Sequence, residues 1–127
     1  MLTKLCAAGI LLVSLAGCGA SQQFPAVPAD LDRTRVATDT ITVEAKRYVF
    51  LPEKIQVEHA RLIVLRITAT DGDHGFALPA FGIDERLDQG VTKLIAFYPP
   101  QQGTYDFKCS KLCGIGHFGM NGQIIVK

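Results

Sequence analysis

Two thiols, an imidazole and a thioether lie close together near the end of the chain, in the segment CSKLCGIGHFGM. Glycines between them accept backbone angles that other residues resist, so the segment can fold tightly around an ion. Three kinds of site use such side chains: a disulfide, a zinc site and a copper site. The side chains follow the spacing C-x3-C-x3-H-x2-M and belong to Cys109, Cys113, His117 and Met120.

A disulfide between Cys109 and Cys113 is the ordinary expectation for two cysteines in an exported domain, but it would close a very short loop and constrain the unfolded chain little. Zinc is also compatible with a cysteine pair and a nearby histidine, although zinc sites more often use C-x2-C pairs. Met120 argues against zinc, because a thioether is a soft ligand that suits copper. The residue types therefore favour copper.

One more ligand is expected from outside this segment, and His74 is the candidate. It lies in DGDHGFALP, where a predicted buried strand ends and the next apolar segment begins. In a β-sandwich, such a position can lie beside a loop near the C-terminus. Asp71, Asp73 and Asp84 could orient the ligands, but we expect all three to be solvated loop carboxylates.

The chain after Thr40 consists of short β-type segments separated by turn residues. Residues 61–69, RLIVLRITA, form a continuous apolar run that is typical of a strand buried on both faces. Residues 81–90, FGIDERLDQG, lack a strand pattern and are predicted to form a loop with a helical turn. Six to eight strands over residues 40–127 predict an all-β fold in which two sheets pack over one core.

The N-terminal segment predicts export. In residues 1–17, Lys4 precedes an apolar run that is too short to span a bilayer, as in a secretory signal peptide. The tetrapeptide LAGC resembles the bacterial lipobox, which implies cleavage before Cys18 and attachment of lipid to it; an ordinary signal peptide with an incidental thiol is the alternative. Residues 18–39 are predicted to form a flexible tether. We therefore expect a membrane-anchored domain that faces the periplasm or the cell exterior.

Length and charge restrict the function classes. A chain of 127 residues has the length of one domain, and a net charge of +1 offers no basic surface for nucleic acid. The sequence shows no catalytic triad and no carboxylate pair, so substrate chemistry is not expected.

The cysteine-rich segment and the residues around His74 resemble the CuA domain of cytochrome c oxidase subunit II. CSKLCGIGHFGM matches the family pattern C-S-x-x-C-G-x-x-H-x-x-M, and DHGFALPAFGIDERLDQG is similar to the family's upstream histidine segment. The resemblance covers about residues 40–127. It implies a cupredoxin-like Greek-key β-sandwich that carries a binuclear centre of two copper ions.

The resemblance also implies a role for each ligand. The two thiolates would bridge the coppers, and each imidazole would cap one of them. The thioether would be a weak axial ligand, and a backbone carbonyl would complete the set. In this sequence the ligands are, in that order, Cys109 and Cys113, His74 and His117, Met120, and Lys111.

Three features depart from the family. Lys111 stands where the family usually has Glu, whose side chain reaches a magnesium ion beside the catalytic subunit; a cationic Lys cannot bind a metal in that way. The sequence shows no transmembrane hairpin before the domain. It also has no Trp, whereas the family receives electrons from cytochrome c through an aromatic patch that contains one. These departures suggest a stand-alone, lipid-anchored CuA-like protein.

The function implied by the resemblance is outer-sphere electron transfer in a respiratory chain. The redox partner would be a protein such as a cytochrome c or a terminal oxidase. Phe118, which follows His117, is the aromatic residue that could lie exposed as an electron port.

Two other functions remain open at this point. A mononuclear blue-copper protein would leave Cys109 unexplained, because its ligands would be His74, Cys113, His117 and Met120. A copper delivery protein for oxidase assembly would bind the metal and hand it on without turning over electrons.

Lipid attachment at Cys18 is open to a direct test. The variant Cys18→Ser should move the protein from the membrane fraction to the soluble fraction, because serine cannot form the thioether to lipid. Fractionation followed by immunoblotting measures this, with Cys6→Ser, a change inside the signal peptide, as the control. Unchanged partitioning of Cys18→Ser would count against the anchor.

Overall fold

The computed structural model describes residues 23–127; the predicted signal peptide and Cys18 lie outside the described residues. The described chain forms nine strands and two short 3-10 helices. The strands are β1 (Thr38–Lys46), β2 (Val49–Leu51), β3 (Lys54–Val57), β4 (Leu62–Ala69), β5 (His74–Leu78), β6 (Ile83–Leu87), β7 (Thr92–Phe97), β8 (Gly103–Lys108) and β9 (Asn121–Val126), and the 3-10 helices are η1 (Pro79–Phe81) and η2 (His117–Gly119).

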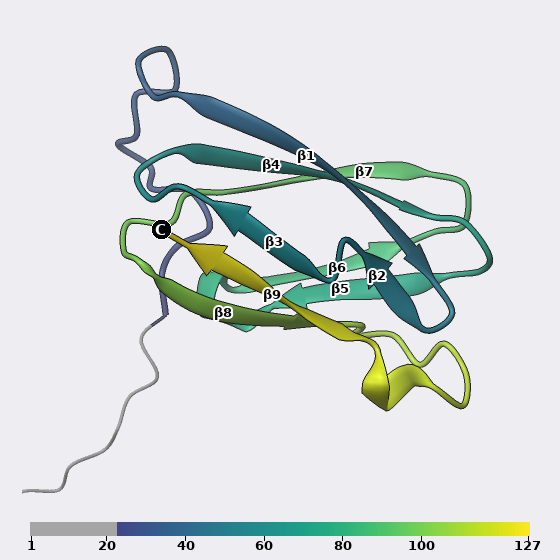
Figure 1. Cartoon of the computed structure of the whole chain (residues 1–127). Coiled ribbons are helices and arrows are strands. Elements are labelled where there is room, and N and C mark those ends of the chain that lie inside the picture. The colour runs from purple at the N-terminus through teal and green to yellow at the C-terminus, as the bar shows by residue number, and fades with distance from the viewer. Residues whose placement is uncertain (1–22) are drawn as a thin grey trace, which may run out of the picture.

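The strands form two facing sheets, as Figure 1 shows. One sheet has the order β2-β1-β4-β7 and the other the order β3-β9-β8-β5-β6. The pairs β1–β4 and β3–β9 are parallel, whereas the remaining neighbours are antiparallel. The predicted all-β sandwich is confirmed. The nine strands exceed the predicted range because β2 is separate from β1 and because β6 was not predicted.

The core between the sheets is rich in aromatic rings. Phe50, Phe76 and Phe107 are fully buried, with ring centroids 5.2–5.9 Å apart. They come from β2, β5 and β8, so the cluster joins both sheets. Each buried ring removes a large apolar area from water, which is the main force holding the layers together.

The prediction that residues 61–69 are buried on both faces is wrong. In β4, alternate residues from Ile63 to Ala69 are buried, but on the opposite face Arg66 is exposed and Val64 and Thr68 are half-buried. That face is the outer side of the sheet, which no further layer covers within the described chain. The apolar run therefore marks a central strand of a two-layer fold.

The prediction of a loop with a helical turn at residues 81–90 is also wrong for most of that segment. The 3-10 helix η1 ends at Phe81, and Ile83–Leu87 form the edge strand β6. Ile83 and Leu87 are buried, but Glu85 between them pairs with Lys93 at 2.6 Å. A charged residue at the middle position hides the period of two that would have indicated a strand.

Part of the predicted tether lies within the described residues and contacts the domain. The Phe24 amide donates to the Ala80 carbonyl at 2.7 Å, and the Tyr98 amide donates to the Ala26 carbonyl at 2.7 Å. The Phe24 ring lies 5.5 Å from that of Phe81. In residues 23–127, no helix has the length and apolar character needed to cross a membrane.

Gly122 is a position where the sheet leaves no room for a side chain. A Cβ there would overlap the Glu53 carbonyl oxygen and the Phe107 ring. Gly122→Ala should lower the free energy of unfolding by about 1–3 kcal/mol through overpacking. Thermal denaturation of the metal-free protein measures this change.

Gly119→Ala is the matched control, because no atom lies within 4 Å of the position that a Cβ would occupy there. Equal stability of the two variants would show that β9 does not pack against Phe107 in this way.

Candidate metal centre

The cysteine-rich segment forms the connection between β8 and β9, called here the ligand loop (residues 109–120). Cys109 follows the last residue of β8 and Met120 precedes the first residue of β9. The Cys109 amide donates to the Met120 carbonyl at 2.9 Å, which continues the antiparallel pairing of the two strands. The ends of the loop are therefore fixed by the sheet, and its start and end ligands lie side by side.

Strand alternation directs His74 and Cys109 toward the same end of the core. His74 precedes buried Phe76 by two positions on β5. Cys109 lies just after β8, two positions beyond buried Phe107, where the pairing with β9 continues. Side chains two positions apart in a strand share a face. The aromatic cluster that stabilises the sandwich therefore also positions one ligand on each of two strands.

Gly75 allows the two ligands to approach. A Cβ on Gly75 would overlap the Ser110 hydroxyl oxygen and would lie 2.7 Å from the Lys111 amide nitrogen. Any side chain at this position would push the start of the ligand loop away from β5. Glycine is required here by the close contact of two backbones.

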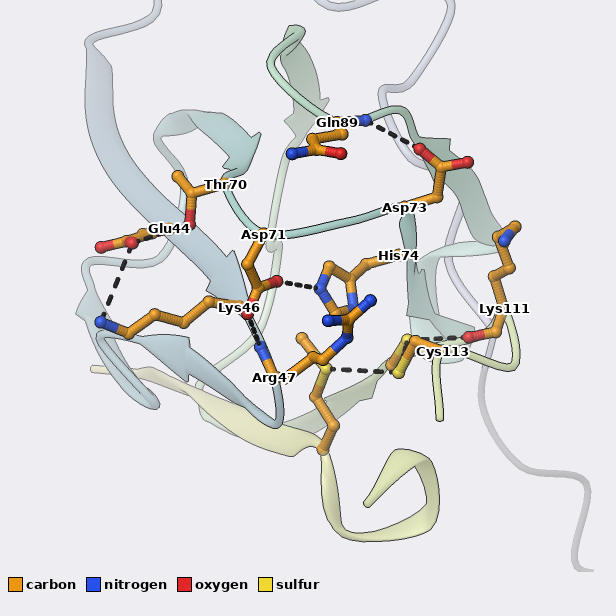
Figure 2. Close-up of polar contacts among 12 residues, drawn as sticks. Glu44, Lys46, Arg47, Thr70, Asp71, Asp73, His74, Gln89, Lys111 and Cys113 are labelled. Atoms are coloured by element: carbon orange, nitrogen blue, oxygen red, sulfur yellow. Dashed lines mark hydrogen bonds and ion pairs between the residues drawn. The ribbon is translucent and has the colours of Figure 1, made fainter. Parts of the chain in front are cut away.

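The candidate ligands of the loop lie around the sulfur of Cys113. Figure 2 shows Cys113 with His74 and Lys111. The Sγ of Cys113 lies 3.6 Å from the Sγ of Cys109, 3.6 Å from Nδ1 of His117 and 3.9 Å from Sδ of Met120. Cys109 Sγ also lies 3.1 Å from the backbone carbonyl of Lys111. Both cysteines are free thiols in the structure.

His74 places an imidazole nitrogen near the two thiols. One ring nitrogen of His74 and the sulfurs of Cys109 and Cys113 lie within 4.8 Å of one another. The structure thus brings together all six residues that the sequence singled out, with Lys111 contributing its backbone carbonyl.

One nitrogen of the His74 ring has a partner and the other has none. Nε2 lies 3.0 Å from Oδ1 of Asp71, which as a carboxylate can only accept, so Nε2 carries the proton. In a neutral imidazole Nδ1 is then the acceptor. It is buried without a hydrogen-bond partner among the described residues. A buried polar atom without a partner is costly, and at a cluster of thiols it indicates a site for a metal ion.

Asp71 corrects the expectation of solvated loop carboxylates. Its two oxygens accept from different groups, Oδ1 from His74 and Oδ2 from the Arg47 amide at 2.8 Å. Burial acts to raise the pKa of Asp71, but the hydrogen bonds from His74 and Arg47 outweigh it and hold the pKa below its usual value. Asp71 is therefore ionised and fixes the orientation of the imidazole.

Asp73 and Asp84 do not contact the ligands. Asp73 accepts from the Gln89 amide at 2.9 Å and from the Arg86 guanidinium at 2.8 Å, and Asp84 is exposed. The Gln89 hydrogen bond, followed by the charges of Arg86 and Lys111, lowers the pKa of Asp73 despite some desolvation. Asp73 lies in a loop as expected, whereas Asp84 is exposed but belongs to the edge strand β6 and not to a loop.

Ionisation of the Cys113 thiol is unfavourable in the absence of a metal. Burial, together with the hydrogen bond and charge of Cys109, raises the pKa of Cys113 to about 11, against a smaller opposing effect of the Arg47 charge. The thiol is therefore protonated at neutral pH in the metal-free protein. Metal binding must displace this proton, as it does at cysteine sites generally.

Apolar side chains cover the outside of the ligand loop. Leu112, Ile115 and Phe118 are 70%, 101% and 89% exposed. The ring centroids of Phe118 and His117 are 5.1 Å apart, so the expected exposure of Phe118 beside His117 is confirmed. The exposure of Leu112 and Ile115 was not predicted. Apolar residues in a glycine-rich loop are the sequence signal that could have indicated it.

The donor set fits copper better than zinc. Two thiols, two imidazoles, a thioether and a backbone carbonyl exceed the four ligands of a closed tetrahedral zinc site. Soft sulfur donors combined with imidazole suit copper, and a distant thioether is typical of copper electron-transfer sites.

Comparisons with known proteins agree with this fold. Residues 8–126 match the family model of the cupredoxin-like domain. Cytochrome c oxidase subunit 2 of Thermus thermophilus is 32% identical over 88 residues, which cover 69% of this chain and 65% of that protein. The chain thus spans just under two thirds of the length of that relative.

Solved structures show the same architecture. The periplasmic domain of subunit II of cytochrome oxidase from Bradyrhizobium japonicum superposes with a TM-score of 0.65 at 24% identity, covering 69% of this chain and 83% of that one. Auracyanin A, a blue copper protein from Chloroflexus aurantiacus, gives a TM-score of 0.59 at 16% identity, covering 72% of this chain and 100% of that one. At such identities the likeness shows a shared fold, and with the family match over residues 8–126 it follows that the chain belongs to the cupredoxin-like domain family.

Proposed function

We propose that this protein is an electron carrier with a binuclear copper centre of the CuA type. The observation that carries the proposal is the buried, unpartnered Nδ1 of His74, in a residue that offers a ring nitrogen within 4.8 Å of the two free thiols of Cys109 and Cys113. The similarity to cytochrome c oxidase subunit 2 supports the same assignment. The proposed ligands are His74, Cys109, Cys113, His117, Met120 and the backbone carbonyl of Lys111.

Copper held by these residues would supply one-electron transfer, with the two thiolates and the two imidazoles as its main ligands. The chain's own contribution is to hold the ligands still and keep them dry. His74, Cys109 and Met120 are buried, and the two strands and the hydrogen bond to Asp71 fix their positions. This arrangement supports electron transfer and needs no open position for a substrate.

The redox partner is proposed to dock at the end of the sandwich that carries the ligand loop. His117 is half-buried there beside the exposed ring of Phe118, where a partner could approach the ligands closely. A cytochrome c or a terminal oxidase is the proposed class of partner, because the curated relative is an oxidase subunit.

Export and membrane anchoring complete the proposal. Residues 1–17 would be removed as a signal peptide and Cys18 would carry the lipid, which places residues 40–127 on the periplasmic or outer side of the membrane. The periplasmic location of the Bradyrhizobium japonicum domain supports this orientation.

Metal content and electron paramagnetic resonance of the copper-loaded full chain test the function. We expect two coppers per chain and a signal in which one electron is shared equally between them. Cys109→Ser should abolish the shared signal, because a serine hydroxyl cannot replace a bridging thiolate. The matched variant Ser110→Cys, which adds a thiol without removing a ligand, should retain it.

The alternatives give different results in the same measurements. One copper per chain, with a signal that survives Cys109→Ser, would establish a mononuclear blue-copper site instead. A chain that binds only Cu(I) and shows no reversible redox couple would be a copper delivery protein. A disulfide between Cys109 and Cys113 in metal-loaded protein would rule out all three functions.

The hydrogen bond from His74 to Asp71 should strengthen copper binding. His74 and the Arg47 amide donate to different oxygens of Asp71, and in Asp71→Asn one of these oxygens becomes an NH2 group, so one of the two donors loses its acceptor. We expect copper affinity to fall by about 10–100-fold, the usual effect of removing such a partner. Competition with a chromophoric Cu(I) chelator measures the affinity.

Asp73→Asn is the control, because Asp73 makes its hydrogen bonds away from the ligands. An equal loss of affinity in both variants would mean that general surface charge, and not the orientation of His74, is responsible.

A further inference from the structure

The turn between β1 and β2 contacts both the loop that precedes His74 and the ligand loop. Arg47 and Tyr48 occupy this turn. In Figure 1 the turn lies at the same end of the sandwich as the ligand loop, and Figure 2 shows Arg47 beside Asp71. Neither residue was indicated by the sequence, because neither is a metal ligand nor part of the cysteine-rich segment.

Arg47 contacts the part of the chain that carries His74. Its amide donates to Oδ2 of Asp71 at 2.8 Å, and the other oxygen of Asp71 accepts from the His74 ring. A terminal guanidinium nitrogen of Arg47 lies 3.0 Å from the position of a Cβ on Gly72. The Arg47 side chain therefore lies against the loop between β4 and β5, immediately before the ligand.

Tyr48 contacts the other part of the site. Its half-buried ring packs against the core on one side and the ligand loop on the other. A Cβ on Gly114 would overlap the Tyr48 hydroxyl, and a Cβ on Gly116 would overlap the ring carbons Cγ and Cδ2. The ring therefore lies directly on the backbone between Cys113 and His117.

The middle of the ligand loop has few other ties to the sandwich. The backbone hydrogen bonds found for residues 109–120 join the loop to itself: Cys109 to Met120, His117 to Gly114, Gly119 to Gly116 and Met120 to His117. Leu112, Ile115 and Phe118 point to solvent. Contact with the Tyr48 ring is thus a principal restraint on the segment that carries His117.

We propose that Arg47 and Tyr48 act as a clamp that fixes the ligand loop relative to His74. Arg47 holds the His74 side through Asp71, and Tyr48 holds the His117 side through Gly114 and Gly116. Because the two residues are adjacent, the distance between the two imidazoles is set before any metal binds. The inference rests on the proposed function for its role in copper binding, but the clamp is a property of the metal-free fold.

Such a clamp would lower the cost of binding, because a pre-ordered loop loses less conformational freedom when the metal arrives. It would also limit the movement of the ligands when the charge of the site changes. Arg47 and Tyr48 are therefore positioning residues that act through the backbone of other residues.

Hydrogen exchange of the metal-free full chain tests the clamp. The amides of His117, Gly119 and Met120 donate within the loop, so their exchange reports its opening. Tyr48→Ala should speed their exchange about tenfold relative to the amides of β9, because the loop loses its packing surface. Tyr48→Phe keeps the ring on Gly116 and removes only the hydroxyl at Gly114, so it should change the exchange rates much less than Tyr48→Ala.

Tyr105→Ala is a control for loss of a half-buried tyrosine. Tyr105 lies on β8, and its ring packs against those of Phe24 and Phe81. The first residue of β8 pairs with Val126, at the end of the sheet away from the site. The variant should change the stability of the whole domain without a selective effect on the loop. A selective effect of Tyr105→Ala, or none of Tyr48→Ala, would overturn the proposal.

Gly116→Ala tests the same contact from the opposite side. Gly116 has φ −88°, which alanine adopts readily, so any effect must come from its methyl group pushing on the Tyr48 ring. We expect the same selective acceleration as in Tyr48→Ala. Gly119→Ala, whose Cβ meets nothing within 4 Å, should exchange like the unchanged protein. Equal behaviour of the two glycine variants would contradict the clamp.

A second measurement connects the clamp to the metal. Copper transfer from the loaded protein to a chelator should be about tenfold faster for Tyr48→Ala than for Tyr48→Phe. Failure of the chain to bind two coppers would remove the proposed function but leave the exchange result standing. Conversely, normal copper binding with unchanged loop exchange in Tyr48→Ala would remove the clamp alone.

Discussion

A buried imidazole with one satisfied nitrogen and one unsatisfied nitrogen is the constraint around which this domain is arranged. Asp71 accepts from Nε2 of His74 and so leaves Nδ1 of the neutral ring free to bind a metal ion. Keeping a polar atom unpaired in the interior costs free energy in the absence of a ligand. The fold maintains that costly state because Asp71 holds the ring, while the close contact at Gly75 brings the ligand loop beside the strand that carries His74.

Stability and site geometry depend on the same side chains. Phe76 and Phe107 form the centre of the core, and each lies two positions from a candidate ligand on its strand. Any change that shifts these rings would therefore move His74 or Cys109 as well. Tight packing of the interior makes such a shift costly, which is how a small β-sandwich holds ligands from distant parts of the sequence in register.

Local spacing allowed most of the site to be predicted, and non-local contacts explain what was missed. The four residues of the cysteine-rich segment are close in sequence, and His74 was indicated by its place at the end of a strand. Asp71 was misjudged because a loop carboxylate has no sequence signature for bonding to a ring nitrogen. β6 was missed because Glu85 interrupts its alternation, and Tyr48 because its contact with Gly116 exists only after both sheets have formed.

The contact between Cys109 and Lys111 uses a main-chain oxygen, and this has a consequence for how the protein can diverge. Every amino acid carries the same carbonyl, so natural variation at this position can change the charge on the surface beside the site without altering the donor that faces the sulfur. The side chain of residue 111 can therefore vary with the partner protein that binds this surface. At this one position, partner recognition by the side chain can evolve independently of metal binding by the backbone carbonyl.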